Sequence, residues 1–371
     1  MTVLKVIIRR LLLWSNIILV IALLLSTWLP KLSPQSLWLS GFAGLFFPIF
    51  CSLCLIYIPI WLFYKKPYYW FSIAGILLCI NAIRHSFGTN FRSPAASKKA
   101  ASHFTLMSFN TSSMGLKSYS ADQTLSKEID SVLKVASPDI LCLQEFYTND
   151  NPKLVDNLNH IRQNLNYPHF YFTCDKTQWN TWHFGIALFS RYPVVDAHKI
   201  PCGYSPAGSG SSFLQADVLI GKDTVRIITA QLQSYMFNGN DYNHLGNLKN
   251  KASFSLSGLG QVIKKMRRTF SSRATQAEAL SRLASESPYA TVICGDFNDT
   301  PVSYTYNTLS RNLKDTFLET SWGLGRTLSF LSPTLRIDYI LTQDNFNING
   351  FQIYKQPFFE HFPIMANLSL K

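Results

Sequence analysis

The chain has 371 residues, a length that fits one large domain or two ordinary ones. Its formal net charge is +13, but the first hundred residues hold ten Lys and Arg and no acidic residue, so the remaining 24 basic and 21 acidic residues leave only +3. The excess of positive charge is therefore typical of segments that flank membrane spans and is only a weak indication of nucleic-acid binding. The seven cysteines are scattered and show no disulfide framework.

Three uncharged apolar runs, Leu11–Pro30, Leu32–Tyr64 and Pro67–Ile83, fill most of the N-terminal part. A helix that crosses a bilayer needs roughly 17–25 apolar residues, so two runs qualify and the third lies at the lower limit. The first run is longer than the core of a signal peptide, lacks a small-residue cleavage site and precedes further runs. We therefore predict a membrane anchor of two to three transmembrane helices over residues 1–86, followed by a linker over 87–102.

The cations around these runs predict how the chain crosses the bilayer. One group lies in Lys5–Arg10, before the first run, and Lys65–Lys66 separate the second run from the third. Because cytoplasmic flanks are rich in Lys and Arg, both groups are expected in the cytoplasm. Three crossings then place the rest of the chain outside it, although the cations between Arg84 and Lys99 favour the opposite side. We predict an integral membrane protein whose C-terminal domain is extracytoplasmic.

Beyond the linker, strand-like and helix-like segments alternate, which predicts an α/β domain over residues 103–371. Many short apolar strands with flanking helices favour two packed sheets covered by helices. The predicted strands are 104–109, 140–144, 184–190, 225–233, 290–295 and 336–341, and the predicted helices are 124–136 and 274–285.

Polar side chains gather where these predicted strands end. Strand ends hold side chains rigidly and open onto solvent, as a preorganised site requires. Carboxylates, carboxamides and one histidine suit a hard divalent cation such as Mg²⁺ or Mn²⁺, whereas a zinc site would need paired His or Cys ligands. Such a set also supplies a base for the attack of water on phosphorus. The residues are Asn110, Glu145, Asp296, Asn298 and Asp338, joined by Glu360 and His361 near the end of the chain.

Each of these residues alone has a simpler explanation. Asn110 after a strand is usually a turn former, Gly295–Asn298 can be an ordinary turn, and a single histidine near a chain end is more often structural. Their occurrence together, in one order along the chain, favours a functional site.

The same order of motifs resembles the endonuclease/exonuclease/phosphatase superfamily, which includes deoxyribonuclease I, AP endonucleases and neutral sphingomyelinases. The combination of G-D-F-N with a downstream D-Y-I and a terminal histidine is specific. Apolar spans ahead of this domain resemble a membrane-anchored bacterial branch of the superfamily. The motifs are Leu106–Asn110, Pro138–Glu145, Phe184–Pro193, Gly295–Pro301, Arg336–Leu341 and Glu360–Pro363.

The resemblance implies a four-layer α/β sandwich of two packed sheets flanked by helices, with the site at one edge. Asn110, Glu145 and Glu360 are expected to bind the metal, Mg²⁺ or Mn²⁺. Glu360 departs from the family pattern, which has Asp before the terminal histidine, and its longer side chain is expected to shift the metal geometry.

The same resemblance implies roles for five residues in catalysis. Asp296 is expected to position and deprotonate the attacking water, and Asn298 to donate a hydrogen bond to a phosphate oxygen. His361 is expected to contact the phosphate or shuttle a proton, with Asp338 fixing its tautomer. Gln231 stands where the family has a His-Leu pair, or Tyr in some branches; it can donate a hydrogen bond but cannot transfer a proton at neutral pH.

Two functions follow from these expectations. The first is a membrane-anchored, metal-dependent phosphodiesterase acting on phospholipid headgroups or nucleic acid; the second is a weakened or inactive membrane-tethered binding module that retains the fold. The stretch Lys249–Arg273 holds seven cations and no acid, which fits a basic flap near the site, an anionic lipid surface or a solvated helix. Few aromatic residues lie among these cations, so a stacking platform for single strands is not indicated. The expected partners are the lipid bilayer and a phosphodiester substrate.

Overall fold

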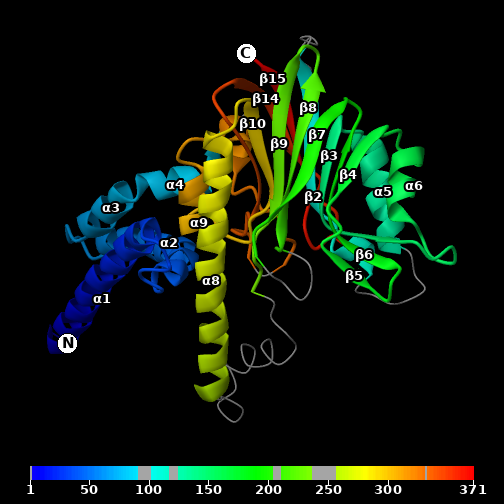
Figure 1. The fold of residues 1–371 in the computed structure, drawn as a ribbon. Helices are drawn as coiled ribbons and strands as arrows, with labels where there is room; N and C mark the ends of the chain where they lie inside the picture. Colours follow the sequence, from blue (N-terminus) through cyan, green and yellow to red (C-terminus); the bar gives the residue numbers. More distant parts are fainter. Residues whose placement is uncertain (1, 91–101, 117–123, 204–209, 236–255, 331) are drawn as a thin grey trace.

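The computed structural model describes residues 2–90, 102–116, 124–203, 210–235, 256–330 and 332–371. Figure 1 shows a β-sandwich, helices on both of its faces, and a set of N-terminal helices that extends from one side. The part before Gly88 is helical, and the sheets are built from the rest of the chain, so the change in secondary structure follows the change in composition.

The larger sheet has seven strands in the order β14-β15-β2-β3-β6-β4, with β5 paired to β6. Its central strands are apolar on both faces because they contact the other sheet on one side and helices on the other. The bounds are β2 His103–Asn110, β3 Ile140–Asn149, β4 His169–Phe172, β5 Lys176–Gln178, β6 Trp182–Ser190, β14 Phe346–Ile353 and β15 Ile364–Leu370.

The smaller sheet has six strands in the order β11-β13-β10-β9-β8-β7. Its edge strand β7 has no fully buried residue and carries exposed polar side chains such as His198 and Lys199, as expected of a strand at the rim. The bounds are β7 Val194–Pro201, β8 Ser212–Ile220, β9 Asp223–Gln231, β10 Ala290–Asp296, β11 Lys314–Asp315 and β13 Asp338–Thr342.

Three hydrophobic cores join four layers. Side chains from both sheets, including Leu106 and Val292, form the core between them. A second core packs α5 and α6 on the larger sheet, and a third packs α8 and α9 on the smaller one, so the predicted four-layer α/β sandwich is confirmed. The helices are α5 Thr124–Ala136, α6 Asn157–Asn164, α8 Leu256–Ser285, α9 Tyr304–Leu309 and α10 Thr316–Thr320, with a 3-10 turn at Ser113–Gly115.

Two pairs of parallel strands decide where polar side chains converge. β2 runs parallel to β3 with Asn110 opposite Gln144, and β9 runs parallel to β10 with Gln231 opposite Asp296. The two pairs meet across the sandwich, since Asn110 Nδ2 donates a hydrogen bond to Asp296 Oδ2 over 3.0 Å. The carboxyl ends of strands from both sheets therefore open at one edge.

The N-terminal helices form a bundle joined by small and polar residues. Ser15 and Tyr57 share a hydrogen bond of 2.7 Å between α1 and α2, and Ser72 of α3 donates to Asn16 of α1 over 2.8 Å. Interhelical hydrogen bonds of this kind are typical of helices packed in a bilayer. The bounds are α1 Thr2–Trp28, α2 Ser40–Phe63, α3 Tyr69–Leu78 and α4 Ile80–Ser86, with a 3-10 turn at Leu29–Lys31.

Two of these helices are long and apolar enough to cross a membrane, Leu4–Lys31 and Ser40–Phe63. Only 22% and 17% of their most apolar windows is buried, which distinguishes them from the core helices of a soluble domain. The predicted third span instead forms two short helices, α3 and α4, which are separated at Cys79. With 10 residues, α3 alone is too short to cross a bilayer.

The bundle is attached to the sandwich by specific contacts. Arg336 Nη2 donates a hydrogen bond to the carbonyl of His85 over 2.5 Å, and Asn90 Nδ2 donates to the carbonyl of Leu318 over 2.8 Å. The short strand β1 (Gly88–Thr89) pairs with β12 (Trp322–Gly323). The start of the predicted linker is therefore bound to the domain, while residues 91–101 lie outside the described part of the chain.

Helix α8 is longer than the predicted helix 274–285 and includes most of the basic stretch. Arg273, which the sequence places among the cations of a possible basic surface, is fully buried and pairs with Asp299 at 3.2 Å. This corrects the expectation for Arg273, because a guanidinium enclosed by protein serves its own carboxylate partner and cannot bind a polyanion. Lys249 and Lys251 lie outside the described residues.

We predict that Gly44→Ala weakens the attachment of α2 to the sandwich. A Cβ at Gly44 would overlap the carbonyl of Val302, whereas a Cβ at Gly260 of α8 would meet nothing nearby. Overpacking costs roughly 1–3 kcal/mol, so Gly44→Ala should lower the midpoint of thermal unfolding of the full chain in detergent. Gly260→Ala is the matched control and should leave the midpoint unchanged or raise it. Equal midpoints for the two variants would contradict this packing.

Candidate active site

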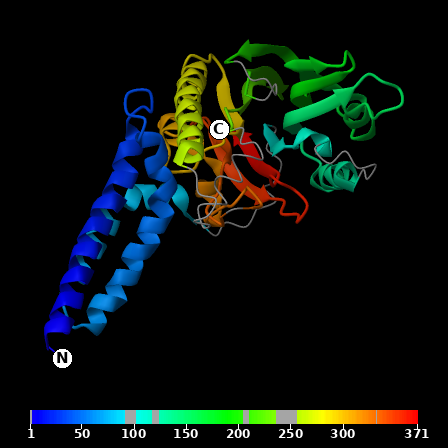
Figure 2. The same ribbon diagram turned by 90° about the horizontal axis from the view of Figure 1, so that it is seen from below.

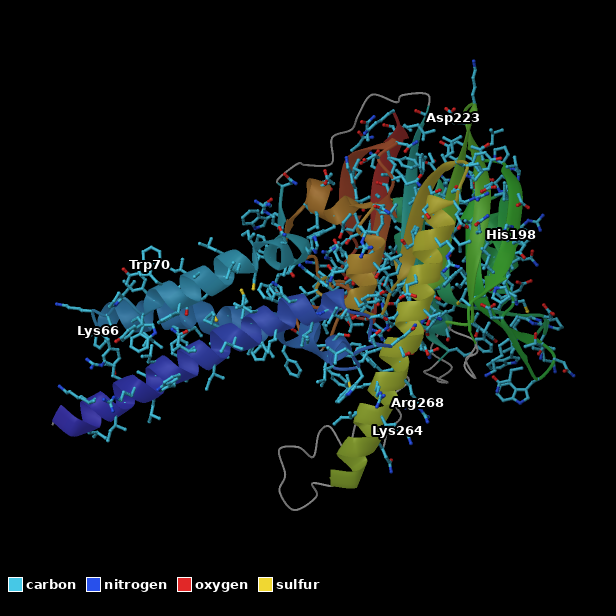
Figure 3. All side chains as sticks on the ribbon, turned by 60° about the vertical axis from the view of Figure 1, so that its left-hand side comes forward. Lys66, Trp70, His198, Asp223, Lys264 and Arg268 are labelled. Carbon is cyan, nitrogen blue, oxygen red and sulfur yellow. The ribbon has the colours of Figure 1, made fainter. Side chains whose placement is uncertain are left out.

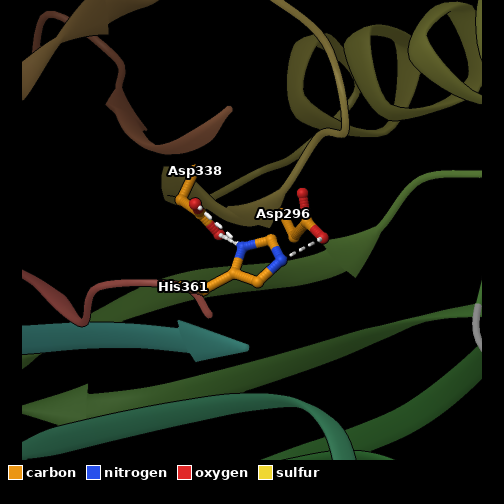
Figure 4. Close-up of side chains that lie close together, drawn as sticks. All are labelled: Asp296, Asp338 and His361. Atoms are coloured by element: carbon orange, nitrogen blue, oxygen red, sulfur yellow. Dashed lines mark hydrogen bonds and ion pairs between the residues drawn. The ribbon is translucent and has the colours of Figure 1, made fainter. Parts of the chain in front are cut away.

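Three buried ionisable side chains meet at the open edge of the sandwich (Figure 4). Asp296 ends β10, and the antiparallel pairing of β10 with β13 places it opposite Asp338. His361 lies between β14 and β15 and reaches the same point. One ligand atom of each residue lies within 4.8 Å of the others, so the three form one cluster.

Asp338 fixes the orientation of the His361 ring. His361 Nδ1 lies 3.1 Å from both carboxylate oxygens of Asp338, so this nitrogen carries a proton and donates it. The other ring nitrogen, Nε2, faces Asp296 at 3.9 Å. Burial alone would lower the pKa of His361, but the carboxylates of Asp338 and Asp296 raise it to about 10. His361 is therefore an imidazolium at neutral pH and carries a proton on Nε2 that it can donate.

The carboxylate of Asp296 is buried and accepts three hydrogen bonds. The backbone N–H of Asn298 donates to Oδ1 over 2.9 Å, and the side-chain amides of Asn298 and Asn110 donate to Oδ2 over 3.0 Å each. Burial raises the pKa of Asp296 to about 7, opposed by the His361 imidazolium and assisted by the charge of Asp338. Asp296 can thus exchange a proton near neutral pH, as a general base must.

The side-chain amide of Asn298 donates its hydrogen bonds to other residues of the protein. Its Nδ2 donates to Asp296 and also to the carbonyl of Leu232, each over 3.0 Å. Its backbone φ of 53° lies in the left-handed region, which asparagine adopts more readily than most residues. The hydrogen bond to phosphate expected of Asn298 therefore requires one of these contacts to be exchanged.

Glu145 projects into the site from an irregular part of β3. The register of β3 shifts between Leu143 and Phe146, and Glu145 has a φ of 46°. Such a bulge redirects a side chain out of the regular alternation of a strand. Gln231 Nε2 donates to Glu145 Oε1 over 2.6 Å, and Asn110 Nδ2 approaches the same oxygen at 3.4 Å. Gln231, although it departs from the family pattern, thus holds an expected metal ligand.

Glu360 joins the site through Ser112. The Ser112 hydroxyl donates to Glu360 Oε2 over 3.3 Å, and the Ser112 backbone N–H donates to Asn110 Oδ1 over 3.0 Å. The three residues expected to bind a metal, Asn110, Glu145 and Glu360, are therefore connected at the same edge. Their oxygen atoms fit a hard divalent cation. The Oε1 atom of Gln231 is buried without a hydrogen-bond partner in the described part of the chain, which leaves an acceptor beside them.

Two supporting residues were not found by sequence reasoning. Ser112 links Asn110 to Glu360, and its only sequence signal is its place two residues after a strand end. Thr327 Oγ1 accepts hydrogen bonds from the backbone N–H groups of Ile337 and Asp338, at 3.0 and 3.2 Å, and so positions the start of β13. A threonine in a loop carries no sequence signal for this role.

Comparisons with known proteins find matches for both parts of the chain. A family model described as "Endonuclease/Exonuclease/phosphatase family" matches residues 107–357, and a model of a domain of unknown function matches residues 9–86. No curated protein sequence matches the chain.

Solved structures of similar fold include humanized D. rerio TDP2 with 14 mutations, the human Nocturnin catalytic domain with bound sulfate anion, and an endonuclease/exonuclease/phosphatase family protein from Leptotrichia buccalis C-1013-b. Their sequences are 14%, 17% and 12% identical to this chain, and each has a TM-score of 0.50. The matches cover 73%, 73% and 72% of this chain and 100%, 94% and 100% of the respective structures. At this identity the likeness shows the fold alone.

We predict that the His361 ring stays protonated well above neutral pH. In NMR spectra of the histidine-labelled full chain, its resonance should titrate near pH 10, and Asp338→Asn should lower that pKa by removing the ion-pair partner. The folded-state pKa is raised, so the stability contributed by the pair is fully present below about pH 6.5 and is lost as pH rises through about 10. His361→Gln identifies the resonance, and titration of the wild-type ring near 6.5 would contradict the assignment.

Proposed function

We propose that this chain, which belongs to the endonuclease/exonuclease/phosphatase family, is a membrane-anchored, metal-dependent phosphodiesterase. The family consists of hydrolases that act as nucleases and phosphatases. The observation that carries the proposal is the convergence of Asp296, Asp338 and His361 within 4.8 Å, next to Asn110 and Glu145. The substrates that fit this set are phosphodiesters, in phospholipid headgroups or in nucleic acid.

The proposed reaction transfers two protons around one displacement at phosphorus. Asp296 accepts a proton from water as the water oxygen bonds to phosphorus, and the bond between phosphorus and the leaving oxygen breaks. The imidazolium of His361 donates its Nε2 proton to the leaving oxygen, and the Asp338 carboxylate, 3.1 Å from Nδ1, stabilises the charged ring before this step. The products are a phosphate monoester and an alcohol, and the proton gained by Asp296 balances the one lost by His361.

Asn110, Glu145 and Glu360 are proposed to hold a divalent cation, Mg²⁺ or Mn²⁺. Carboxylate and amide oxygens suit such a hard cation. The buried Oε1 of Gln231, which has no hydrogen-bond partner among the described residues, adds an acceptor of the same kind. When bound, the cation supplies positive charge that offsets the negative charge on the phosphate. Gln231 and Ser112 orient the carboxylates of Glu145 and Glu360 through their hydrogen bonds.

We assign Asn298 a positioning role toward Asp296. Its backbone and side-chain N–H groups both donate to the Asp296 carboxylate, so Asn298 aims the proposed base. If its hydrogen bond to the Leu232 carbonyl is released, one amide hydrogen of Asn298 becomes free to bond a phosphate oxygen. This is the role that the family resemblance implies for Asn298.

A second candidate function, a weakened or inactive membrane-tethered binding module, is motivated by the departures at Gln231 and Glu360. Two contacts favour the enzyme over this module. Gln231 retains a donor to Glu145 at 2.6 Å, and the longer side chain of Glu360 reaches the hydroxyl of Ser112. Both departing residues are therefore integrated in the hydrogen bonds of the site.

We further propose that the N-terminal helices anchor the domain in a membrane. Their exposed surface is apolar, and Trp28 and Trp70, both more than half exposed, stand near opposite ends of the bundle. Tryptophan at both ends of an apolar span is typical of the two membrane–water interfaces.

The arrangement of the bundle supports the predicted orientation. Figure 3 shows Lys66 and Trp70 at the end of the bundle remote from the sandwich, and Figure 2 shows the N-terminus at that same end. The cations of Lys5–Arg10 and Lys65–Lys66 therefore share one end, which the positive-inside rule places in the cytoplasm. α3 and α4 together lead the chain back to the sandwich, which is then extracytoplasmic.

We predict that Asp296→Asn lowers hydrolysis by at least ~10²-fold because the proposed base is lost. The full chain in detergent is assayed with Mg²⁺ against bis-p-nitrophenyl phosphate, DNA and phospholipid vesicles. Asp344→Asn, at a carboxylate whose side chain is 80% exposed, is the matched control and should keep wild-type activity. Chelation of divalent cations should abolish the activity of wild type and control alike.

If wild type and Asp296→Asn both failed to hydrolyse all three substrates, this result would falsify the enzyme proposal and favour the inactive binding module. Within the enzyme proposal, Gln231→His should raise turnover, because it adds a group that can transfer a proton at neutral pH. Strong inhibition of DNA cleavage by salt would favour a nuclease, and activity confined to vesicles would favour phospholipid headgroups.

We predict that Asn90→Cys is modified by a membrane-impermeant maleimide in intact cells, whereas Lys66→Cys is modified only after the cells are opened. Asn90 lies on the sandwich side of the bundle and Lys66 at its remote end, so the pair reports the two sides of the bilayer. The reverse pattern would place the domain in the cytoplasm.

A further inference from the structure

The N-terminal half of α8 extends beyond the sandwich. Figures 1 and 3 show it running past the strands on the side of the molecule where the N-terminal helices lie. Its contacts with the core of the smaller sheet come from its C-terminal half, through Ala277, Leu280 and Ala284. Among the described residues, those of α8 before Phe270 therefore lie outside this core, although Val262 and Thr269 are buried on one face of the helix.

The exposed face of this projecting half is basic. Gln261, Lys264 and Arg268 are exposed and lie three to four residues apart, hence on one face of the helix, and Arg267 is exposed next to them. Within the described part of the chain, these three cations form no ion pair with an acidic residue. The sequence between Asp241 and Glu278 contains no acid at all. Among the described residues, the positive charge of this face is thus not paired with an acid.

Contacts with Trp38, between α1 and α2, and with Phe42, in the first turn of α2, fix the position of this face. The guanidinium of Arg267 lies 5.8 Å from the ring centre of Trp38, and Phe270 packs edge-on against Phe42 at 4.9 Å. Trp38 and Phe42 lie where the two long apolar helices meet the sandwich. Tryptophan is enriched at the membrane–water interface, so in the proposed anchor Trp38 would place Arg267 and its neighbours at the level of the lipid headgroups.

We propose that the basic face of α8, defined by Gln261, Lys264, Arg267 and Arg268, binds the anionic lipid headgroups of the membrane that holds the anchor. This inference rests on the proposed membrane anchor. Guanidinium and ammonium groups bind lipid phosphates, and their long apolar stems lie along the boundary between headgroups and acyl chains. An amphipathic helix with such a face lies on a bilayer surface.

The composition of the face favours lipid over nucleic acid. Single-stranded nucleic acid is bound by cations together with exposed aromatic rings on which bases stack. Within the described part of α8, the one aromatic residue, Phe270, is buried against Phe42. Trp38 is already covered by Arg267. The face therefore has charge for phosphates and no stacking surface for bases.

Contact of α8 with headgroups directs the candidate active site toward the bilayer. The backbone N–H of Gln233 donates to Gln276 Oε1 over 2.8 Å, and Arg273 Nε donates to the carbonyl of Gln233 over 3.1 Å. These bonds tie α8 to the segment that directly follows Gln231 at the end of β9. If α8 lies on the headgroups, the edge of the sandwich that holds the candidate active site lies near the membrane surface. A phosphodiester of a lipid or of a surface-bound polymer can then reach Asp296.

The experiment places an environment-sensitive dye on the full chain in proteoliposomes. Cys174, the exposed cysteine, is replaced by serine, and the dye is attached through Gln261→Cys, which removes no cation. His198→Cys on β7 is the matched control, because Figure 3 shows it on the sandwich away from the bundle. Vesicles of phosphatidylcholine, with or without phosphatidylglycerol, carry quenchers at headgroup depth.

The dye at position 261 should be quenched, more strongly with phosphatidylglycerol, and the dye at 198 should not. Lys264→Glu combined with Arg268→Glu should abolish the phosphatidylglycerol-dependent quenching at 261 while leaving the midpoint of thermal unfolding unchanged. Equal quenching at 261 and 198 would overturn the proposal. A larger response at 261 to single-stranded DNA than to phosphatidylglycerol would also overturn it and would mark the face as a nucleic-acid surface.

Flotation of the same vesicles after alkaline washing distinguishes the headgroup contact from the proposed membrane anchor on which it rests. A chain that does not float overturns the membrane anchor and the headgroup contact together. A chain that floats without quenching at 261 overturns the headgroup contact alone. Hydrolysis of bis-p-nitrophenyl phosphate, which needs no membrane, is measured on the same samples and reports the phosphodiesterase proposal independently.

Discussion

Arg336 carries a buried positive charge on which the sandwich, the helical bundle and the candidate site all depend. Its side chain is 1% exposed; it pairs with Asp315 and donates to the carbonyl of His85. Burial lowers the pKa of a guanidinium, but the charge of Asp315 raises it, so Arg336 remains ionised. A charge in such a place costs several kcal/mol unless its partners are present. Asp315 belongs to the smaller sheet and His85 to the bundle, so one charge joins both parts.

The same charge lies two residues before Asp338, which makes the bundle part of the site's support. The hydroxyl of Tyr339 lies 2.6 Å from the carbonyl of Arg336 and 2.9 Å from that of Asp299, and its one hydrogen is shared between these two acceptors. This contact holds the segment from Arg336 to Asp338 against the loop at Asp299. The bidentate contact of Asp338 with His361 needs this segment in one place. Removal of the bundle, and with it the backbone carbonyl of His85, would leave a buried N–H of Arg336 without this acceptor, at a cost of roughly 1–3 kcal/mol. The N-terminal helices are therefore more than a passive tether.

The features that could be predicted from the sequence are those that local residue patterns specify. The predicted helix 124–136 agrees with α5, and the predicted strand 104–109 lies within β2, because apolar periodicity specifies such elements residue by residue. The order of motifs located Asp296, Asp338 and His361, which the fold brings together. Local pattern could not supply the left-handed backbone of Glu145, the link through Ser112 or the first half of α8. Each of these depends on residues distant in sequence.

The positive charges discussed above form two groups, one at the remote end of the bundle and one on α8. Cations at the remote end of the bundle, in Lys5–Arg10 and at Lys65–Lys66, flank spans directly and therefore count for orientation. The basic face of α8 lies more than 170 residues after the bundle, and charges so far from a span have little influence on insertion. Its cations are therefore compatible with the proposed extracytoplasmic domain and with the headgroup contact proposed for α8. If the proposed anchor crosses a bilayer as inferred above, the two groups of cations act on its opposite sides: the first would set the direction of crossing, and the second would hold the candidate site near the lipid.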